Sequence, residues 1–111
     1  MIVEFELEGR SFTALNAGPN FKFNEAISFI IHCETQAELD YYWDKLSEGG
    51  DLNAQQCGWL KDKYGLSWQV IPQVLATLMS SSDREKSQKV MNALLAMKKI
   101  IIQDLENAFN S

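Results

Sequence analysis

The sequence predicts a mixed α+β fold that combines short antiparallel hairpins with a β–α–β unit and ends in helices. Polar and apolar residues alternate strictly over Ile2–Glu8, which is typical of a half-buried strand. Apolar residues recur at helical spacing over residues 39–46, which indicates an amphipathic helix. A strand–turn–strand pattern fills Cys57–Pro72, so both kinds of element share one short chain.

The composition limits what the chain can do. Its 111 residues allow one domain at most, and a hydrophobic content of 46% suits a folded globule. A formal net charge of -5 argues against nucleic acid as a partner, because phosphate binding needs clustered Lys and Arg. No apolar run approaches the roughly 20 residues of a membrane span, and no signal peptide is evident. We expect a cytoplasmic protein with free thiols at Cys33 and Cys57, both inside predicted strands.

Two strands, Ile2–Glu8 and Arg10–Asn16, are predicted to form the first hairpin through a turn at Glu8-Gly9. A two-residue turn fixes which residues lie opposite each other. The expected pairs are Phe5–Phe12, Val3–Ala14, Glu4–Thr13 and Glu6–Ser11. The hairpin therefore has one apolar face and one polar face.

A third strand is predicted over Ile27–Cys33, and a capping box at Thr35–Glu38 begins a helix that Gly49-Gly50 ends. The second hairpin, Cys57–Pro72, turns at Asp62–Gly65, since Asp favours the first turn position and Gly the last. The apolar stripe of the helix comprises Leu39, Tyr42, Trp43 and Leu46.

The remaining sequence is helical. Pro72 suits the first helical position before Gln73–Met79, and a capping box at Ser82–Glu85 begins another helix. Further helical turns follow over Ile100–Phe109. The second of these helices carries an apolar stripe of Val90, Leu94 and Met97, widened by Met91 and Leu95.

Several motifs together resemble one family. They are Glu4–Leu7, Phe12–Asn16, Phe21–Ser28, Tyr41–Trp43 with Leu46–Gly50, and the Cys57–Pro72 block. They resemble the PhnB-like, "demethylubiquinone methyltransferase-like" family of the vicinal-oxygen-chelate superfamily, which also holds glyoxalase I, bleomycin-resistance proteins and extradiol dioxygenases. The resemblance implies a glyoxalase/bleomycin-resistance-like βαβββ module that lacks the family's usual N-terminal strand–helix–strand. It divides the single domain into a first-module hairpin (1–16), a second module (27–72) and C-terminal helices (73–109).

The apolar face of the first hairpin needs a cover, because an exposed patch of this size is a liability. Two candidates are the C-terminal helix stripe and a second subunit. Since the superfamily commonly builds cavities from paired modules, we expect a homodimer, with exchanged elements as one possible form.

The resemblance also implies a set of inward strand positions that hold metal ligands in superfamily members. In this chain those positions are Gln69, Thr13 and Ser28. Hydroxyl and amide oxygens are poor ligands for zinc or iron. We therefore expect no metal and no cofactor, and these residues become candidates for contacts with a ligand.

Alternation places further candidates on the same cavity face: Glu4, Glu6, His32 and Ser67. Trp59 is a candidate whose face the sequence leaves open. His32 is either a general base or, as is more common, a hydrogen-bonded rim histidine. Glu4 with Glu6 is more often a solvated face than a catalytic pair. Gln69 either orients a ligand or is an amide satisfied by neighbouring backbone.

Three functions stay open at this stage. The first is a metal-free small-molecule binding module with a pocket at a module or dimer interface. The second is a metal-dependent lyase, isomerase or dioxygenase, and the third is a fragment or regulatory subunit completed by a partner chain. Methyl transfer has no support, since the chain has no G-x-G-x-x-G turn. The ligand itself cannot be named from the sequence.

Overall fold

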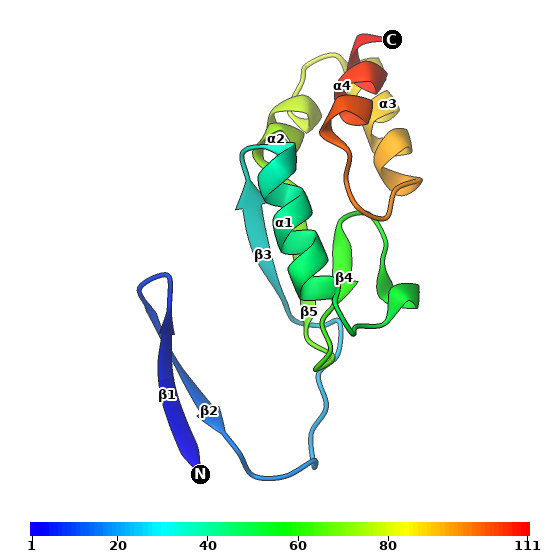
Figure 1. The fold of residues 1–111 in the computed structure, drawn as a ribbon. Coiled ribbons are helices and arrows are strands. Elements are labelled where there is room, and N and C mark those ends of the chain that lie inside the picture. The colour runs from blue at the N-terminus through cyan, green and yellow to red at the C-terminus, as the bar shows by residue number, and fades with distance from the viewer.

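The computed structural model describes residues 1–111 and shows a two-stranded sheet, a three-stranded sheet and four α-helices (Figure 1). This confirms the α+β class. The elements are β1 (Ile2–Leu7), β2 (Arg10–Leu15), β3 (Ser28–Cys33), α1 (Gln36–Ser47), the 3-10 turn η1 (Leu52–Ala54), β4 (Trp59–Lys61), β5 (Ser67–Pro72), α2 (Gln73–Met79), α3 (Arg84–Leu95) and α4 (Ile102–Asn110).

The β1–β2 hairpin has the predicted two-residue turn. Glu8 and Gly9 have φ angles of 52° and 78°, and positive φ at both positions matches the twist of the flanking strands. The pairing is also as predicted, with Phe5 opposite Phe12 and Glu4 opposite Thr13. The sequence thus determines this hairpin locally.

The larger sheet has the strand order β3-β5-β4. β3 and β5 are parallel, and the chain crosses between them through α1 and β4. β4 runs antiparallel to β5 across the Asp62–Gly65 turn, where the Gly65 N–H donates to the Asp62 carbonyl at 3.0 Å. The Asp62 carboxylate accepts from the N–H groups of Tyr64 and Leu66, which explains why Asp begins this turn.

Helix α1 covers one face of this sheet. Thr35 caps it as predicted, since its hydroxyl accepts from the Glu38 N–H at 3.1 Å. Leu39 and Trp43 point to the sheet and are buried with Val70 and Leu60. The face of the sheet under α1 is therefore part of the core.

Helices α2 and α3 begin differently from the prediction. Pro72 has ψ 142°, so it caps α2 from outside instead of filling its first position. Asp83, not Ser82, caps α3, because its carboxylate accepts from the N–H groups of Glu85 and Lys86. Cys57 also lies outside the strands, in a turn with φ 52°.

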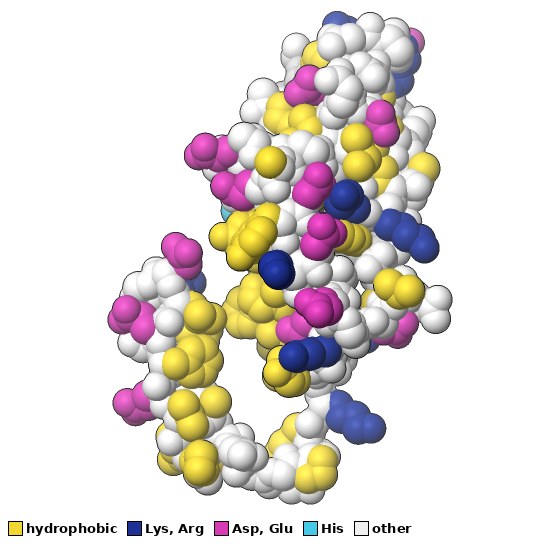
Figure 2. Space-filling model, in the orientation of Figure 1, with side chains coloured by type: hydrophobic (Ala, Val, Ile, Leu, Met, Phe, Trp, Pro, Cys, Tyr) yellow, Lys and Arg dark blue, Asp and Glu magenta, His cyan; other side chains and the backbone are white.

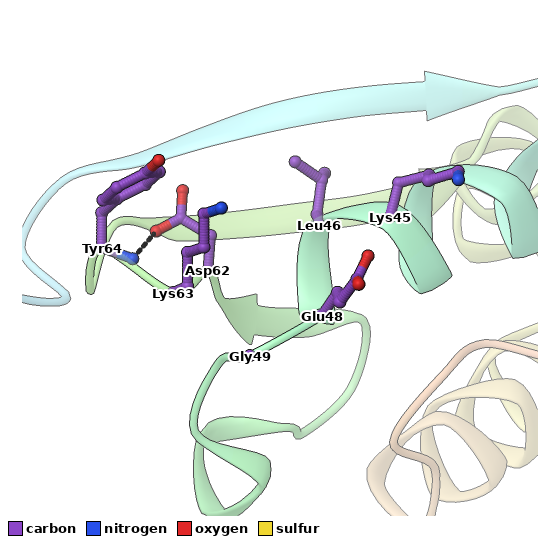
Figure 3. A pocket seen from close by; sticks show the side chains of 7 residues that line it. All are labelled: Lys45, Leu46, Glu48, Gly49, Asp62, Lys63 and Tyr64. Carbon is purple, nitrogen blue, oxygen red and sulfur yellow. Dashed lines mark hydrogen bonds between the residues drawn. The ribbon is translucent and has the colours of Figure 1, made fainter.

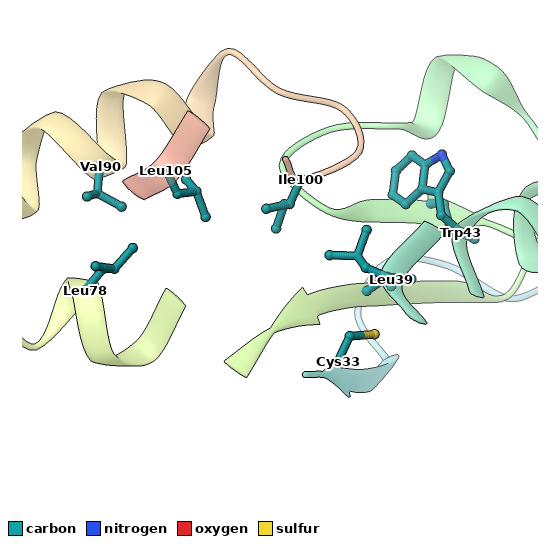
Figure 4. Packing of buried hydrophobic residues seen from close by; sticks show 9 residues of the cluster. Cys33, Leu39, Trp43, Leu78, Val90, Ile100 and Leu105 are labelled. Carbon is teal, nitrogen blue, oxygen red and sulfur yellow. The ribbon is translucent and has the colours of Figure 1, made fainter. Parts of the chain in front are cut away.

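These helices pack against one another at one end of the sheet (Figure 4). Leu78, Val90 and Leu105 meet between α2, α3 and α4, and Ile100 joins them to the core under α1. Leu95, which was expected to widen the α3 stripe, is 57% exposed. Gln36 ties the two parts together, since its amide donates to the Ile100 carbonyl and accepts from the Ile102 N–H.

The β1–β2 hairpin stands apart from the three-stranded sheet and its helices, which we call the body (Figure 1). The C-terminal helix stripe does not cover it, because Val90 is already buried among α2 and α4, so that candidate cover is wrong. The radius of gyration is 16.3 Å, against about 13 Å for a compact chain of this length. Hydrophobic side chains line the inner side of the hairpin, and acidic ones project outward (Figure 2).

Candidate functional site

The sheet face opposite α1 gathers five of the eight sequence candidates. Strand pairing places Ser28 beside Ser67 and Trp59 beside Gln69, and His32 follows on the same face of β3. The pairing with Gln69 also decides the face of Trp59, which the sequence left open. Five candidates from three strands therefore share one surface, which we call the open face.

Gln69 lies at the centre of the open face and is held by one side-chain bond. Its amide nitrogen donates to the Ser28 hydroxyl oxygen at 2.9 Å. The partner is thus a side chain on the neighbouring strand, whereas the simpler interpretation was a bond to backbone. Because Ser28 accepts this bond, its own O–H is free to donate.

Ser67 and Lys61 extend the open face to the end of the sheet where β3 and β5 begin. Ser67 is 1% exposed, and its hydroxyl has no hydrogen-bond partner. Lys61, its partner residue on β4, forms an ion pair with Glu25 from the loop before β3. The hydrogen bond from Lys61 holds the pKa of the Glu25 carboxyl below its usual value.

His32 and Ile30 form the opposite part of the open face, on the edge strand β3. His32 is exposed near the end of the strand, and Ile30 is 51% exposed. His32 makes no ion pair in the structure. Its partner on β5 is Ile71, four residues along that strand from Ser67.

The other three candidates lie on the hairpin. Glu4, Glu6 and Thr13 share its polar face and border a shallow cavity of about 460 Å³. That face turns away from the body, while the apolar face turns toward it (Figure 2). Within one chain, the structure therefore does not bring these three side chains beside Gln69.

A cavity of about 480 Å³ lies between the hairpin turn and strand β3. An aromatic run crosses it: Phe12 meets Phe29 edge-on at 6.0 Å, and Phe29 meets Trp68 at 5.4 Å. The run begins at Phe5, which stacks on Phe12 at 5.5 Å. Sequence reasoning missed this cavity, because a long loop separates the two elements that border it.

A second missed cavity, of about 420 Å³, lies where the end of α1 meets the β4–β5 turn (Figure 3). Its charged side chains come from both elements, with Tyr64 at the turn. Gly50 allows the approach, since a Cβ there would lie 2.0 Å from the Lys61 carbonyl oxygen. The Gly49-Gly50 pair is the available signal in the sequence, but on its own it indicates only a helix end. The lining residues are Lys45, Leu46, Glu48, Gly49, Asp62, Lys63 and Tyr64.

The thiols and carboxylates offer little further chemistry. Burial raises the pKa of the Cys33 thiol to about 11, and nearby Glu38 adds to this. Both cysteines are free. The structure contains no group of three or more His, Cys, Asp or Glu side chains placed to hold a metal ion. None of its helices has the length and apolar character needed to cross a membrane.

Comparisons with known proteins agree on a family. The family model for 3-demethylubiquinone-9 3-methyltransferase matches residues 1–71. The PhnB protein from Bacillus cereus, a solved structure, superposes with a TM-score of 0.56 at 34% identity, covering 65% of this chain and 64% of that one. The chain thus spans less than two thirds of that relative. No curated protein matches it. Since the family model spans more than half of the residues, the chain belongs to the 3-demethylubiquinone-9 3-methyltransferase, PhnB-like family.

Proposed function

We propose that the protein is a metal-free small-molecule binding module whose pocket is completed by a second copy of the chain. The observation that carries this is the open face, where Gln69, Ser28 and Trp59 lie together and are each only partly buried. A mixed polar and apolar surface of this kind suits a small organic ligand. Gln69 would orient the ligand through the amide oxygen that its bond to Ser28 leaves free.

The second copy is proposed because two apolar surfaces of the same chain lack a partner. The inner stripe of the hairpin includes Val3, Phe5 and Leu7, which are 45%, 42% and 50% exposed. Near the start of β3, Ile27 and Ile30 are 69% and 51% exposed. An isolated two-stranded hairpin is at best marginally stable in water, so burying this stripe would stabilise it.

Exchange of hairpins between copies is compatible with the connection. Residues 16–27 contain no helix or strand and can extend over roughly 40 Å. In an exchanged dimer the apolar stripe of the hairpin would pack against the body of the partner, and the polar face with Glu4, Glu6 and Thr13 would stay turned away from it. We also propose that this hairpin and the sheet β3-β5-β4 are parts of two modules within one domain.

The oligomeric state tests the second copy. Light scattering over a tenfold or greater dilution range should give twice the 12.6 kDa chain mass. Phe5→Lys, on the apolar face, should give monomers. Ser11→Lys, on the polar face of the same hairpin, is the matched control and should stay dimeric. A monomer mass at all concentrations contradicts the proposal.

Ligand binding tests the open face. A fragment screen by NMR should shift the side-chain amide signal of Gln69, and Gln69→Leu should abolish that binding. Gln88→Leu, on an exposed face of α3, is the control. Stoichiometric zinc, iron or manganese in the purified protein would instead support the metal-dependent enzyme.

A further inference from the structure

The hydroxyl of Ser67 has no partner although its residue is 1% exposed. It is the only buried side-chain oxygen or nitrogen in the structure without one. Burying a hydroxyl in this way is unfavourable, and each such group in a folded protein calls for an explanation. A ligand atom that accepts a hydrogen bond would provide one.

The residues beside Ser67 are donors. In the strand register Ser67 lies between Ser28 and Lys61. Ser28 accepts from Gln69 at 2.9 Å and keeps its own O–H available. Two hydroxyl donors and an ammonium therefore lie in one row across the sheet, which is the chemistry that an oxyanion requires.

A carboxylate already occupies one end of this row. Glu25 forms an ion pair with Lys61. The Glu25 side chain is 64% exposed and that of Lys61 is 25% exposed. An exposed ion pair adds little stability, so an incoming anion can displace Glu25 at small cost. The next row of the sheet contains Ile30, Gln69 and Trp59, which suit an apolar or aromatic body.

We propose that Lys61, Ser67 and Ser28 bind the carboxylate of a small organic acid, and that Glu25 is an internal competitor for the same position. This inference rests on the proposed binding function of the open face and adds the class of ligand. The acid would place its carboxylate at the row of donors and its apolar part against Trp59. Binding would give the Ser67 hydroxyl its missing acceptor.

Calorimetric titration with benzoate tests the inference, with benzamide as the neutral probe of the same shape and inorganic phosphate as a second oxyanion. Glu25→Gln should tighten benzoate binding about two- to fivefold by removing the competitor. Lys61→Met should weaken it about tenfold or more, and Lys61→Arg should retain it. Ser67→Ala should weaken it about fivefold. Glu106→Gln on α4 makes the same charge change away from the site and should have no effect.

Several results would overturn the inference. The inference is wrong if benzoate and benzamide bind with equal affinity, or if phosphate binds and benzoate does not. It is also wrong if the affinity for benzoate is unchanged in Glu25→Gln and Lys61→Met. A lack of benzoate binding to every variant that remains folded by circular dichroism would likewise contradict it. Neutral fragments that still shift the Gln69 amide signal would leave the proposed function standing in each case. If neither the benzoate probes nor the neutral fragments bind, both the proposed function and this inference are wrong.

Discussion

The β1–β2 hairpin and the body that begins at β3 are equally regular in backbone pairing but differ in burial. All six residue pairs of the hairpin are in register, yet none of its residues is buried, and all 12 buried residues lie between Cys33 and Leu105. Backbone pairing can therefore be specified by local sequence, whereas burial requires a second element. The hairpin has complete backbone pairing but buries little of its apolar surface.

An aromatic contact joins the two regions. Phe12, the one half-buried residue of the hairpin, contacts Phe29 of the body. Contacts of this kind contribute about 0.5–1.5 kcal/mol beyond area burial. Such a contact is much weaker than a hydrophobic core. We therefore propose that a second copy of the chain buries the apolar face of the hairpin.

Matched truncations of leucine should show the largest difference between the regions. Leu105→Ala removes a fully buried side chain between the C-terminal helices and should cost about 2–5 kcal/mol in urea unfolding. Leu7→Ala, in the hairpin at 50% exposure, should cost about 0.5 kcal/mol in dilute protein. At dimer-forming concentrations the Leu7→Ala cost should rise. Equal costs at low concentration would mean that the hairpin is packed as well as the body.

Matched glycine substitutions should give an intermediate difference. Gly58 and Gly9 both have positive φ, at 88° and 78°, so an alanine at either is strained by about 1–2 kcal/mol. At Gly58 the new Cβ would also lie 2.8 Å from Ile100 Cδ1 and 3.2 Å from the Val70 carbonyl, while nothing lies within 4 Å at Gly9. Gly58→Ala should therefore be about 1–3 kcal/mol more costly than Gly9→Ala in thermal or urea unfolding. A smaller cost than that of Gly9→Ala would show that the core relaxes freely around residue 58.

The features that the sequence predicted well are those set by neighbouring residues. The hairpin register, the Thr35 cap and the Asp62 turn each depend on residues within a few positions of one another. The errors at Pro72 and Asp83 are shifts of one position. At the start of α3 the Asp83 carboxylate accepts from two backbone N–H groups, so the neighbour of the predicted cap is the residue that caps the helix.

The features that were missed depend on distant pairs. The face of Trp59 follows from its pairing with Gln69, and the Glu25–Lys61 ion pair joins a loop to a strand. Neither leaves a local pattern in the sequence. The stripe of Val90 and its neighbours was likewise one of two candidate covers for the hairpin, because the stripe is visible in the sequence but its partners in the fold, Leu78 and Leu105, are distant from it in the chain.

The pH dependence of stability should show the smallest difference, and it should arise from the body. Burial raises the pKa of Cys33 from 9.0 to about 11, so the folded state holds this proton more tightly than the unfolded state. The resulting stability is fully present below pH 9 and is lost as the pH rises toward 11, by about 1 kcal/mol at pH 10. Urea unfolding at pH 8 and pH 10 should show this loss in the wild type, and Cys33→Ser should lack that part of it. Cys57→Ser should behave like the wild type. If Cys33→Ser had the wild-type pH dependence, the loss would belong to other groups, and burial at the end of β3 would have no part in it.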